Sequence, residues 1–257
     1  MTSLLTPIAD PWFYAVAVPA VVLFGLSKAG FGGVLGSMGV PLMAVVIAPG
    51  TAVAILLPLL LVMDALGLWA FRRRVDWPLL RLMLPAGMLG CAVGWVLFGL
   101  VDARWVRAII GIEAVLFALM KLAEGQRAWT GDGVPVHPGR GRFWSAVSGF
   151  TSFVSHAGGP PIMQFLLPLK LDRVILVGTM AWFFAAVNFA KIVPYAQLDL
   201  FEWSNLGTSL VLMPLVPTSY WVGLKLLHRM SQKFFIQLSI WGLLIVGTKL
   251  LWDAWHG

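Results

Sequence analysis

Five ionisable residues lie inside apolar stretches of this 257-residue sequence: Lys28, Asp64, Glu113, His156 and Lys191. An ionisable group is costly in the apolar interior of a membrane, so such residues are functional candidates wherever the surrounding stretch spans one. They could bind a charged ligand, relay a proton or form a structural ion pair. Which of these roles applies depends on what the apolar stretches are.

The composition is that of a polytopic α-helical membrane protein. Hydrophobic residues make up 60% of the chain and charged residues 11%, whereas soluble domains carry about 45–50% and about 25%. At about 20 residues per span, ten apolar segments would use most of the chain. The single cysteine, Cys91, excludes an internal disulfide framework, a multi-thiolate zinc site and an iron–sulfur cluster. We expect no metal and no cofactor.

Ten apolar segments divide into two sets of five, at 12–28, 34–48, 51–71, 79–101 and 104–123, and at 143–156, 160–169, 174–194, 203–224 and 234–252. The first two segments of each set are short and broken by glycine or proline, which predicts a hairpin that starts and ends on one side of the membrane. Three full spans follow, so each half crosses an odd number of times and the second half is inverted. We therefore predict an N-terminal transmembrane repeat (1–123), a polar cytoplasmic linker (124–142) and a C-terminal inverted repeat (143–257).

The basic residues predict the orientation. If the N-terminus is outside, the arginine-rich loop 72–74, the linker and the loop at 170–173 all fall inside, while the outer loops hold little beyond Arg104 and Arg107. Cytoplasmic loops carry an excess of Lys and Arg, so both termini are predicted to be outside. The net charge of +7 thus reflects membrane topology, and nucleic acid is not an expected partner.

A weak internal repeat supports the division into halves. Ser27-Lys28-Ala29-Gly30 recurs as Ser155-His156-Ala157-Gly158 after 128 positions, and Lys121-Leu122 recurs as Lys249-Leu250 at the same offset. Inverted repeats with interrupted apolar segments are typical of secondary transporters, whose substrate site lies between the repeats.

The glycine-rich stretches Gly25–Pro41 and Gly149–Pro168 resemble the hairpins of the TauE/SafE family of sulfite exporters and organosulfonate transporters. The resemblance extends over nearly the whole chain and includes the basic turn after the third segment and the linker. It implies movement of small sulfur-containing anions across a bacterial inner membrane. Together with the inverted repeats, this predicts a secondary transporter that works by alternating access and is coupled to an ion, either a proton or sodium. The substrate, the direction of transport and the coupling ion stay open, as does a monomeric or homodimeric state.

The predicted anion site combines the two hairpin breaks. Lys28 and His156 occupy matching repeat positions, and the glycines that follow them leave backbone N–H groups free at a helix start, where partial positive charge suits an anion. The alternatives are a lysine that snorkels to the surface and a neutral histidine hydrogen-bonded between helices. The predicted substrate-binding residues are Lys28, Gly30, Gly32, Gly33, Ser155, His156, Gly158, Gly159, Gln164 and Asn188.

Four residues are candidates for ion coupling: Asp64, Glu113, His156 and Lys191. A proton relay and a structural ion pair are equally compatible with Asp64. Lys191 shares a helix face with Asn188, but its place just before Pro194 favours snorkelling to the surface. Glu113 has no acidic counterpart in the second half, which favours a local structural role.

The main alternative is an anion channel, because glycine hairpins and positive helix ends also suit a pore; a transporter of another small anion is a second. An intramembrane enzyme is not expected. The four histidines form no H-E-x-x-H cluster, and the adjacent Ser155 and His156 would point apart on a helix instead of forming a catalytic pair. The expected partners are the lipid bilayer, the anion and a coupling ion.

Overall fold

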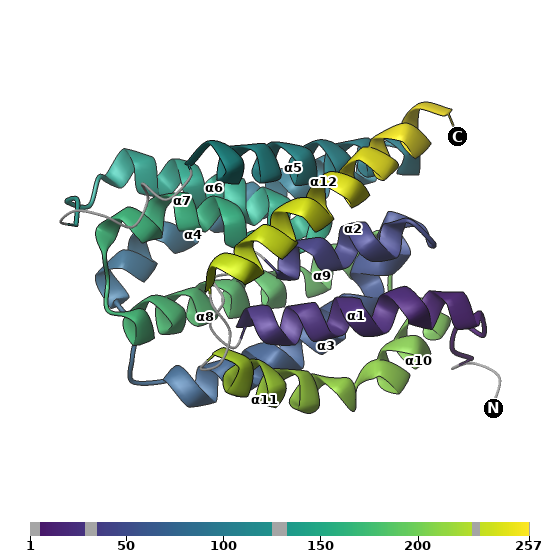
Figure 1. The fold of residues 1–257 in the computed structure, drawn as a ribbon, viewed down its shortest axis with the longest axis horizontal. Helices are drawn as coiled ribbons and strands as arrows, with labels where there is room; N and C mark the ends of the chain where they lie inside the picture. Colours follow the sequence, from purple (N-terminus) through teal and green to yellow (C-terminus); the bar gives the residue numbers. More distant parts are fainter. Residues whose placement is uncertain (1–5, 29–34, 125–132, 228–231, 257) are drawn as a thin grey trace.

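The computed structural model describes residues 6–28, 35–124, 133–227 and 232–256, and over these residues the protein is all-helical (Figure 1). The first half contains α1 (Pro11–Lys28), η1 (Gly36–Met38), α2 (Gly39–Ala44), α3 (Pro49–Phe71), α4 (Trp77–Leu100) and α5 (Ala103–Glu124). The second half contains α6 (Pro138–Ser155), α7 (Gly159–Leu166), η3 (Leu167–Leu169), α8 (Arg173–Ala190), α9 (Ile192–Gln197), α10 (Trp203–Leu212), α11 (Leu215–Leu227) and α12 (Gln232–His256). The expected all-α architecture is confirmed for the described residues.

Several helices are suited to a lipid environment. Four helical stretches of the described chain are long and apolar enough to cross a membrane: α1, α3, α4 and the continuous stretch 174–197, which includes α9. Large apolar side chains cover the outer surface; Trp69 is 72% exposed and Leu100 is 76% exposed. Contiguous apolar surface of this kind is rare in soluble monomers. The length of its apolar helices and its apolar outer surface therefore both indicate a membrane protein.

Side-chain caps and prolines fix where the helices begin. Asp76 accepts a hydrogen bond from the Leu79 N–H at the start of α4, and Asp172 caps α8 in the same way. At the start of α6, His137 accepts from the Arg140 N–H while a proline occupies the first turn, a position where its missing N–H costs nothing. Residues 138–142 of the expected linker are therefore helical, and the linker is shorter than predicted.

One predicted span of the second half, 203–224, is interrupted, whereas the span at 174–194 has a single turn residue within a continuous helical stretch. The segment predicted at 203–224 is divided into α10 and α11 at Met213 and Pro214, because proline has no N–H to donate to the preceding turn. The segment at 174–194 is divided into α8 and α9 at Lys191, although the Lys191 N–H still donates to the Val187 carbonyl.

The two halves pack through small residues. Helix α4 runs along α6, and a Cβ atom added at Gly90 would overlap the Ala146 carbonyl, while one at Gly149 would overlap the Gly87 carbonyl. Helix α1 packs against α11, where a Cβ at Gly25 would overlap the Ser219 side chain. Small residues allow such close approach between helices in membranes.

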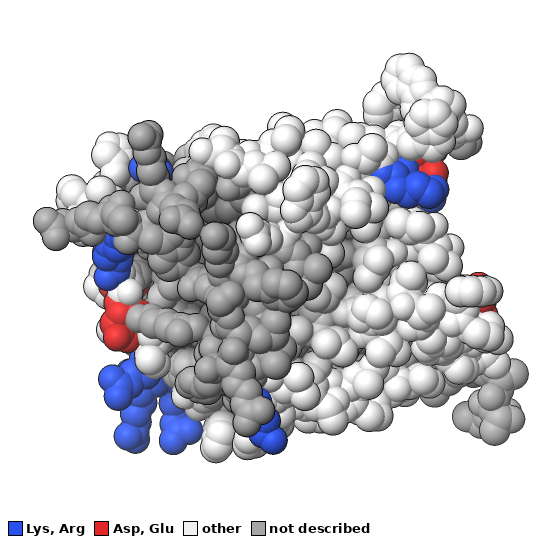
Figure 2. Space-filling model, viewed as in Figure 1, with Lys and Arg blue, Asp and Glu red and all other residues white. Residues whose placement is uncertain are grey.

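The packing partners exchange between the halves. Helix α1, the first of its half, packs on α11 of the second half, and α6, the first helix of the second half, packs on α4 of the first half. Helices α4 and α11 occupy corresponding places in the order of elements. Likewise α3 packs on its counterpart α8, and α5 packs on its counterpart α12. Helix α1 begins and α12 ends at the same end of the molecule (Figure 1). Figure 2 shows most Lys and Arg side chains of this face at the opposite end, which holds the α3–α4 connection. The arrangement is compatible with two related halves, while their inverted orientation stays a prediction.

Candidate functional site

The break between α6 and α7 places His156 in the interior. Helix α6 ends at Ser155 and α7 begins at Gly159. Between them His156 has a positive φ of 52°, a left-handed conformation that ends helices but is uncommon for residues other than glycine. Its N–H donates to the Ser152 carbonyl at 3.1 Å, and the residue is only 7% exposed. The backbone of the break therefore determines where this imidazole points.

Two hydroxyl groups of α6 hold the break in place. Ser148 Oγ donates to the Gly158 carbonyl at 2.6 Å, and Thr151 Oγ1 lies 3.3 Å from the Ala157 carbonyl. Both carbonyl groups lie in the buried break between the two helices, and buried backbone polar groups need hydrogen-bond partners. The hairpin is thus a fixed structure, tied to its own first arm.

Both ring nitrogens of His156 contact other parts of the protein. Nε2 lies 3.0 Å from the Val53 carbonyl of α3, and Nδ1 lies 3.0 Å from Lys191 Nζ. A carbonyl oxygen only accepts, so Nε2 carries the proton and donates; Nδ1 then accepts from the lysine ammonium. His156 is therefore neutral here and links the hairpin to α3 and α8. This contact pattern is the one considered as the alternative for His156, a neutral histidine hydrogen-bonded between helices.

The expectation that Lys191 snorkels to the surface is wrong. Its side chain is 0% exposed. Besides His156 Nδ1, Nζ has three oxygen acceptors within hydrogen-bond distance: the Ser152 carbonyl, the Ser152 hydroxyl at 2.8 Å and Asn188 Oδ1 at 2.9 Å. The three N–H bonds of the ammonium are therefore shared among four acceptors. Ser152 lies in the last turn of α6, where unpaired carbonyls carry partial negative charge and stabilise a cation. The carboxyl end of α6 is what makes a buried ammonium tolerable at this position.

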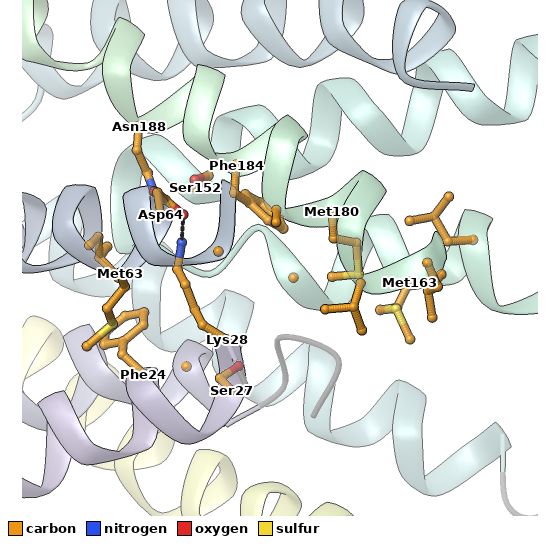
Figure 3. Close-up of a pocket in the computed structure, with 18 of the residues that line it drawn as sticks. Phe24, Ser27, Lys28, Met63, Asp64, Ser152, Met163, Met180, Phe184 and Asn188 are labelled. Carbon is orange, nitrogen blue, oxygen red and sulfur yellow. Dashed lines mark hydrogen bonds and ion pairs between the residues drawn. The ribbon is translucent and has the colours of Figure 1, made fainter. Parts of the chain in front are cut away.

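A chain of polar side chains continues from Lys191 to Lys28. Asn188 Nδ2 donates to Asp64 Oδ2 at 2.6 Å, and the other oxygen of Asp64 forms an ion pair with Lys28 Nζ (Figure 3). A carboxylate only accepts and an ammonium only donates, so the Asn188 amide between them has one possible orientation. Asp64 is 3% exposed. The structural ion pair considered for Asp64 is therefore present, and the chain joins α1, α3, α8 and α6.

A cavity of about 340 Å³ lies beside this chain of side chains. We call it the central cavity; its polar lining residues are Ser27, Lys28, Asp64, Ser152, His156, Lys170, Asn188 and Tyr220. The volume is at the lower end of the range for small-molecule sites. Lys28, the last residue of α1, and His156, which directly follows α6, are 128 positions apart in the sequence and line the same cavity. The apolar side chains of Phe24, Met163, Met180 and Phe184 also line it (Figure 3).

The central cavity carries an excess of positive charge. Lys28 and Lys170 line it and Lys191 contacts Asn188 from the protein side, whereas Asp64 is the one carboxylate among the described lining residues. With His156 neutral, three cations and one carboxylate leave a net charge of +2. Uncompensated positive charge in apolar surroundings favours an anionic ligand.

The family assignment rests on a match over nearly the whole chain. The family model for the sulfite exporter TauE/SafE matches residues 17–250. The chain belongs to the TauE/SafE sulfite exporter family. No curated protein and no solved structure shows significant similarity to it. The TauE/SafE family is a family of membrane transporters, which agrees with the expectation that the chain is not an enzyme.

Four polar lining residues of this TauE/SafE protein were not among the predicted site residues: Ser27, Ser152, Lys170 and Tyr220. Tyr220 of α11 is 7% exposed, and its buried hydroxyl has no hydrogen-bond partner among the described residues. A tyrosine hydroxyl within the predicted apolar segment 203–224 could have indicated a polar group inside the protein. Lys170 is exposed and ends η3 with a φ of 53°; its sequence position in a loop gave no sign that it reaches the cavity.

Three predicted site residues of the TauE/SafE protein lie away from the central cavity. Ser155, Gln164 and Glu113 line a second cavity of about 330 Å³ on the other side of the α6–α7 break. We call this the lateral cavity. Ser155 points there because the left-handed turn at His156 directs consecutive side chains to opposite sides. Ser155 and Gln164 are therefore not ligands of an anion in the central cavity in this conformation.

The predicted backbone donors are fewer than expected. Helix α7 begins at Gly159, which lines the central cavity, but the next two residues are Pro160 and Pro161, and proline has no N–H. Gly158 lines neither cavity. The predictions for Gly30, Gly32 and Gly33 lie outside the described residues.

Proposed function

We propose that the chain is a secondary transporter of a small sulfur oxyanion, sulfite or an organosulfonate, that binds in the central cavity. The observation that carries this proposal is the net positive charge of a buried cavity between the two hairpins of a sulfite exporter family member. Lys170, exposed at the edge of this cavity, would attract the anion as it enters.

The available donors match a group with three oxygens. Lys28 Nζ has three N–H bonds, and among the described residues its hydrogen bond goes to Asp64, so others are available to a ligand. Tyr220 adds a hydroxyl without a partner among the described residues, and Asn188 has a second amide hydrogen beyond the one given to Asp64. Phe24, Met163 and Phe184 would contact the organic part of a sulfonate.

His156 is assigned a positioning role in this proposal. Its contacts with Val53 and Lys191 tie the α6–α7 hairpin to α3 and α8. The central cavity is lined by residues of α1, η1 and α3 of the first half and of α6, α7, η3, α8 and α11 of the second. Movement of one half against the other would open such a site to alternate sides, as in other transporters with repeated halves.

Flux into proteoliposomes tests the proposal. We expect saturable uptake of sulfite or of a short-chain sulfonate, and much slower uptake of carboxylates of the same size. Saturation is expected because each anion must occupy the central cavity before it moves. Non-saturating flux with single-channel conductance would indicate a pore instead, and transport of carboxylates alone would indicate another substrate class.

We further propose that the end rich in Lys and Arg faces the cytoplasm of a bacterial inner membrane and that both termini are outside, since cytoplasmic loops carry the excess of positive charge. The α9 end and the start of α6 then lie on opposite sides. In a Cys91→Ala background, an impermeant thiol reagent should label Gln197→Cys in intact spheroplasts and Val136→Cys only after permeabilisation; both positions are exposed. The reverse pattern would contradict this orientation.

A further inference from the structure

Among the described residues that line the lateral cavity, Glu113 of α5 is the one titratable side chain. Its other lining residues come from α2, α5, α6, α7, α12 and η1 and from the α6–α7 break. Most are apolar, among them Ile109, Phe117 and Leu243, and the polar ones are uncharged: Ser37, Thr151, Ser155 and Gln164. The cavity is on the opposite side of the α6–α7 break from the anion site, and Ser155 and Ala157, which flank His156, both line it. A carboxyl group in such surroundings needs partners if it is to be ionised.

The hydrogen bonds of Ser155 indicate which form Glu113 takes. Ser155 Oγ lies 2.7 Å from Glu113 Oε2 and 3.0 Å from the Thr151 carbonyl oxygen. A serine hydroxyl has one proton, and a carbonyl can only accept. Donation to the carbonyl four residues earlier is the usual bond of serine in a helix. If Ser155 makes that bond, the short contact with Glu113 is a hydrogen bond only when Glu113 supplies the proton.

The charged groups of the neighbouring helices do not compensate a carboxylate here. On α12, Lys249 is paired with Asp253; on α3, Asp64 is paired with Lys28; and Arg140 and Arg142 are exposed at the start of α6. Helices α2 and α7 contain no titratable residue. On α5 itself, Arg107 is six residues from Glu113, about 9 Å along the helix axis. His156 is neutral and lines the other cavity. None of the described residues forms an ion pair with Glu113.

We infer that Glu113 is a proton-binding site of the transporter, protonated at neutral pH, and that it couples proton release to the α6–α7 break through Ser155. This rests on the proposed function for its role in transport. On release, the O–H bond of Glu113 breaks, the proton passes to water, and the Ser155 hydroxyl turns from the Thr151 carbonyl to the new carboxylate. One of the bonds that hold the last turn of α6 is then lost. Because the next residue is His156, the change reaches Lys191 and the central cavity.

Infrared spectroscopy of the reconstituted protein tests the protonation directly. The wild type at neutral pH should show the carbonyl stretching band of a protonated carboxylic acid; Glu113→Gln should lose this band, while the matched variant Asp64→Asn should keep it, since Asp64 is ion-paired. Raising the pH should remove the same band from the wild type, a measurement that needs no variant to fold. A spectrum unchanged by Glu113→Gln, or the absence of any such band in the wild type, would overturn the assignment.

Transport measurements test the coupling separately. An imposed pH gradient should change the rate of sulfite flux several-fold in the wild type and leave it unchanged in Glu113→Gln, with sulfite affinity the same in both. A Glu113→Gln variant that still responds to the pH gradient, or a wild type that responds only to sodium, would overturn the coupling role. Absence of sulfite binding in the wild type would count against the proposed function instead, and the infrared result would still decide whether Glu113 holds a proton.

Discussion

Replacing Asp64 with alanine is expected to lower the free energy of unfolding by about 3–5 kcal/mol, the usual cost of removing one partner of a buried ion pair. Asp64 is 3% exposed and receives both the Lys28 ammonium and the Asn188 amide. Without Asp64, the hydrogen-bonded side chains that link Lys28 to Lys191 contain two ammonium groups and no carboxylate to compensate them. Thermal unfolding in detergent, followed by intrinsic tryptophan fluorescence, measures the loss.

Asp253→Ala is the matched control for this change. It also removes the carboxylate partner of a lysine, Lys249, but these two residues lie one turn apart on the same helix and are accessible to solvent. Such pairs contribute about 0.3–0.5 kcal/mol to the free energy of unfolding. The double variant Lys28→Met/Asp64→Leu should regain most of the lost stability, since apolar side chains of similar volume often replace a buried pair at little cost. Equal effects of Asp64→Ala and Asp253→Ala would mean that the polar chain does not stabilise the fold.

Replacing Lys28 with alanine is expected to weaken sulfite binding about ten- to a hundredfold, which corresponds to the loss of a charge-assisted hydrogen bond worth about 1.5–3 kcal/mol. The substitution also lowers the net charge around the central cavity from +2 to +1. Lys249→Ala, at the exposed pair, should leave the affinity unchanged. Titration calorimetry with sulfite gives both values, and equal affinities in the two variants would place the anion elsewhere.

The helical segments could be predicted from the sequence because apolar length and punctuation by glycine and proline act locally. The predicted segments 12–28, 51–71 and 79–101 agree with α1, α3 and α4 to within two residues at each end. The repeat of Ser-Lys-Ala-Gly as Ser-His-Ala-Gly also predicted that Lys28 and His156 lie near each other, and the structure places both on the central cavity.

The partners of the buried polar groups could not be predicted, because they depend on contacts between distant segments. Asn188 and Asp64 are 124 residues apart, and nothing local indicates that they meet. Lys191 was expected to snorkel because it is near the end of an apolar segment; only the position of the α6 carboxyl end explains why it turns inward. The sequence likewise did not indicate that the neighbours His156 and Ser155 line different cavities. His156 adopts a left-handed conformation and lines the central cavity, whereas Ser155 lines the lateral cavity together with Glu113.

The central claim is that the anion contacts Lys28 in the central cavity, and the sulfite affinity of Lys28→Met/Asp64→Leu tests it most directly. This variant removes one cation and one carboxylate, so the net charge of +2 around the cavity is retained and the fold should stay near wild-type stability. We predict that its affinity for sulfite is reduced about ten- to a hundredfold, as in Lys28→Ala, because the donor is gone. A folded double variant that binds sulfite with wild-type affinity would contradict the account.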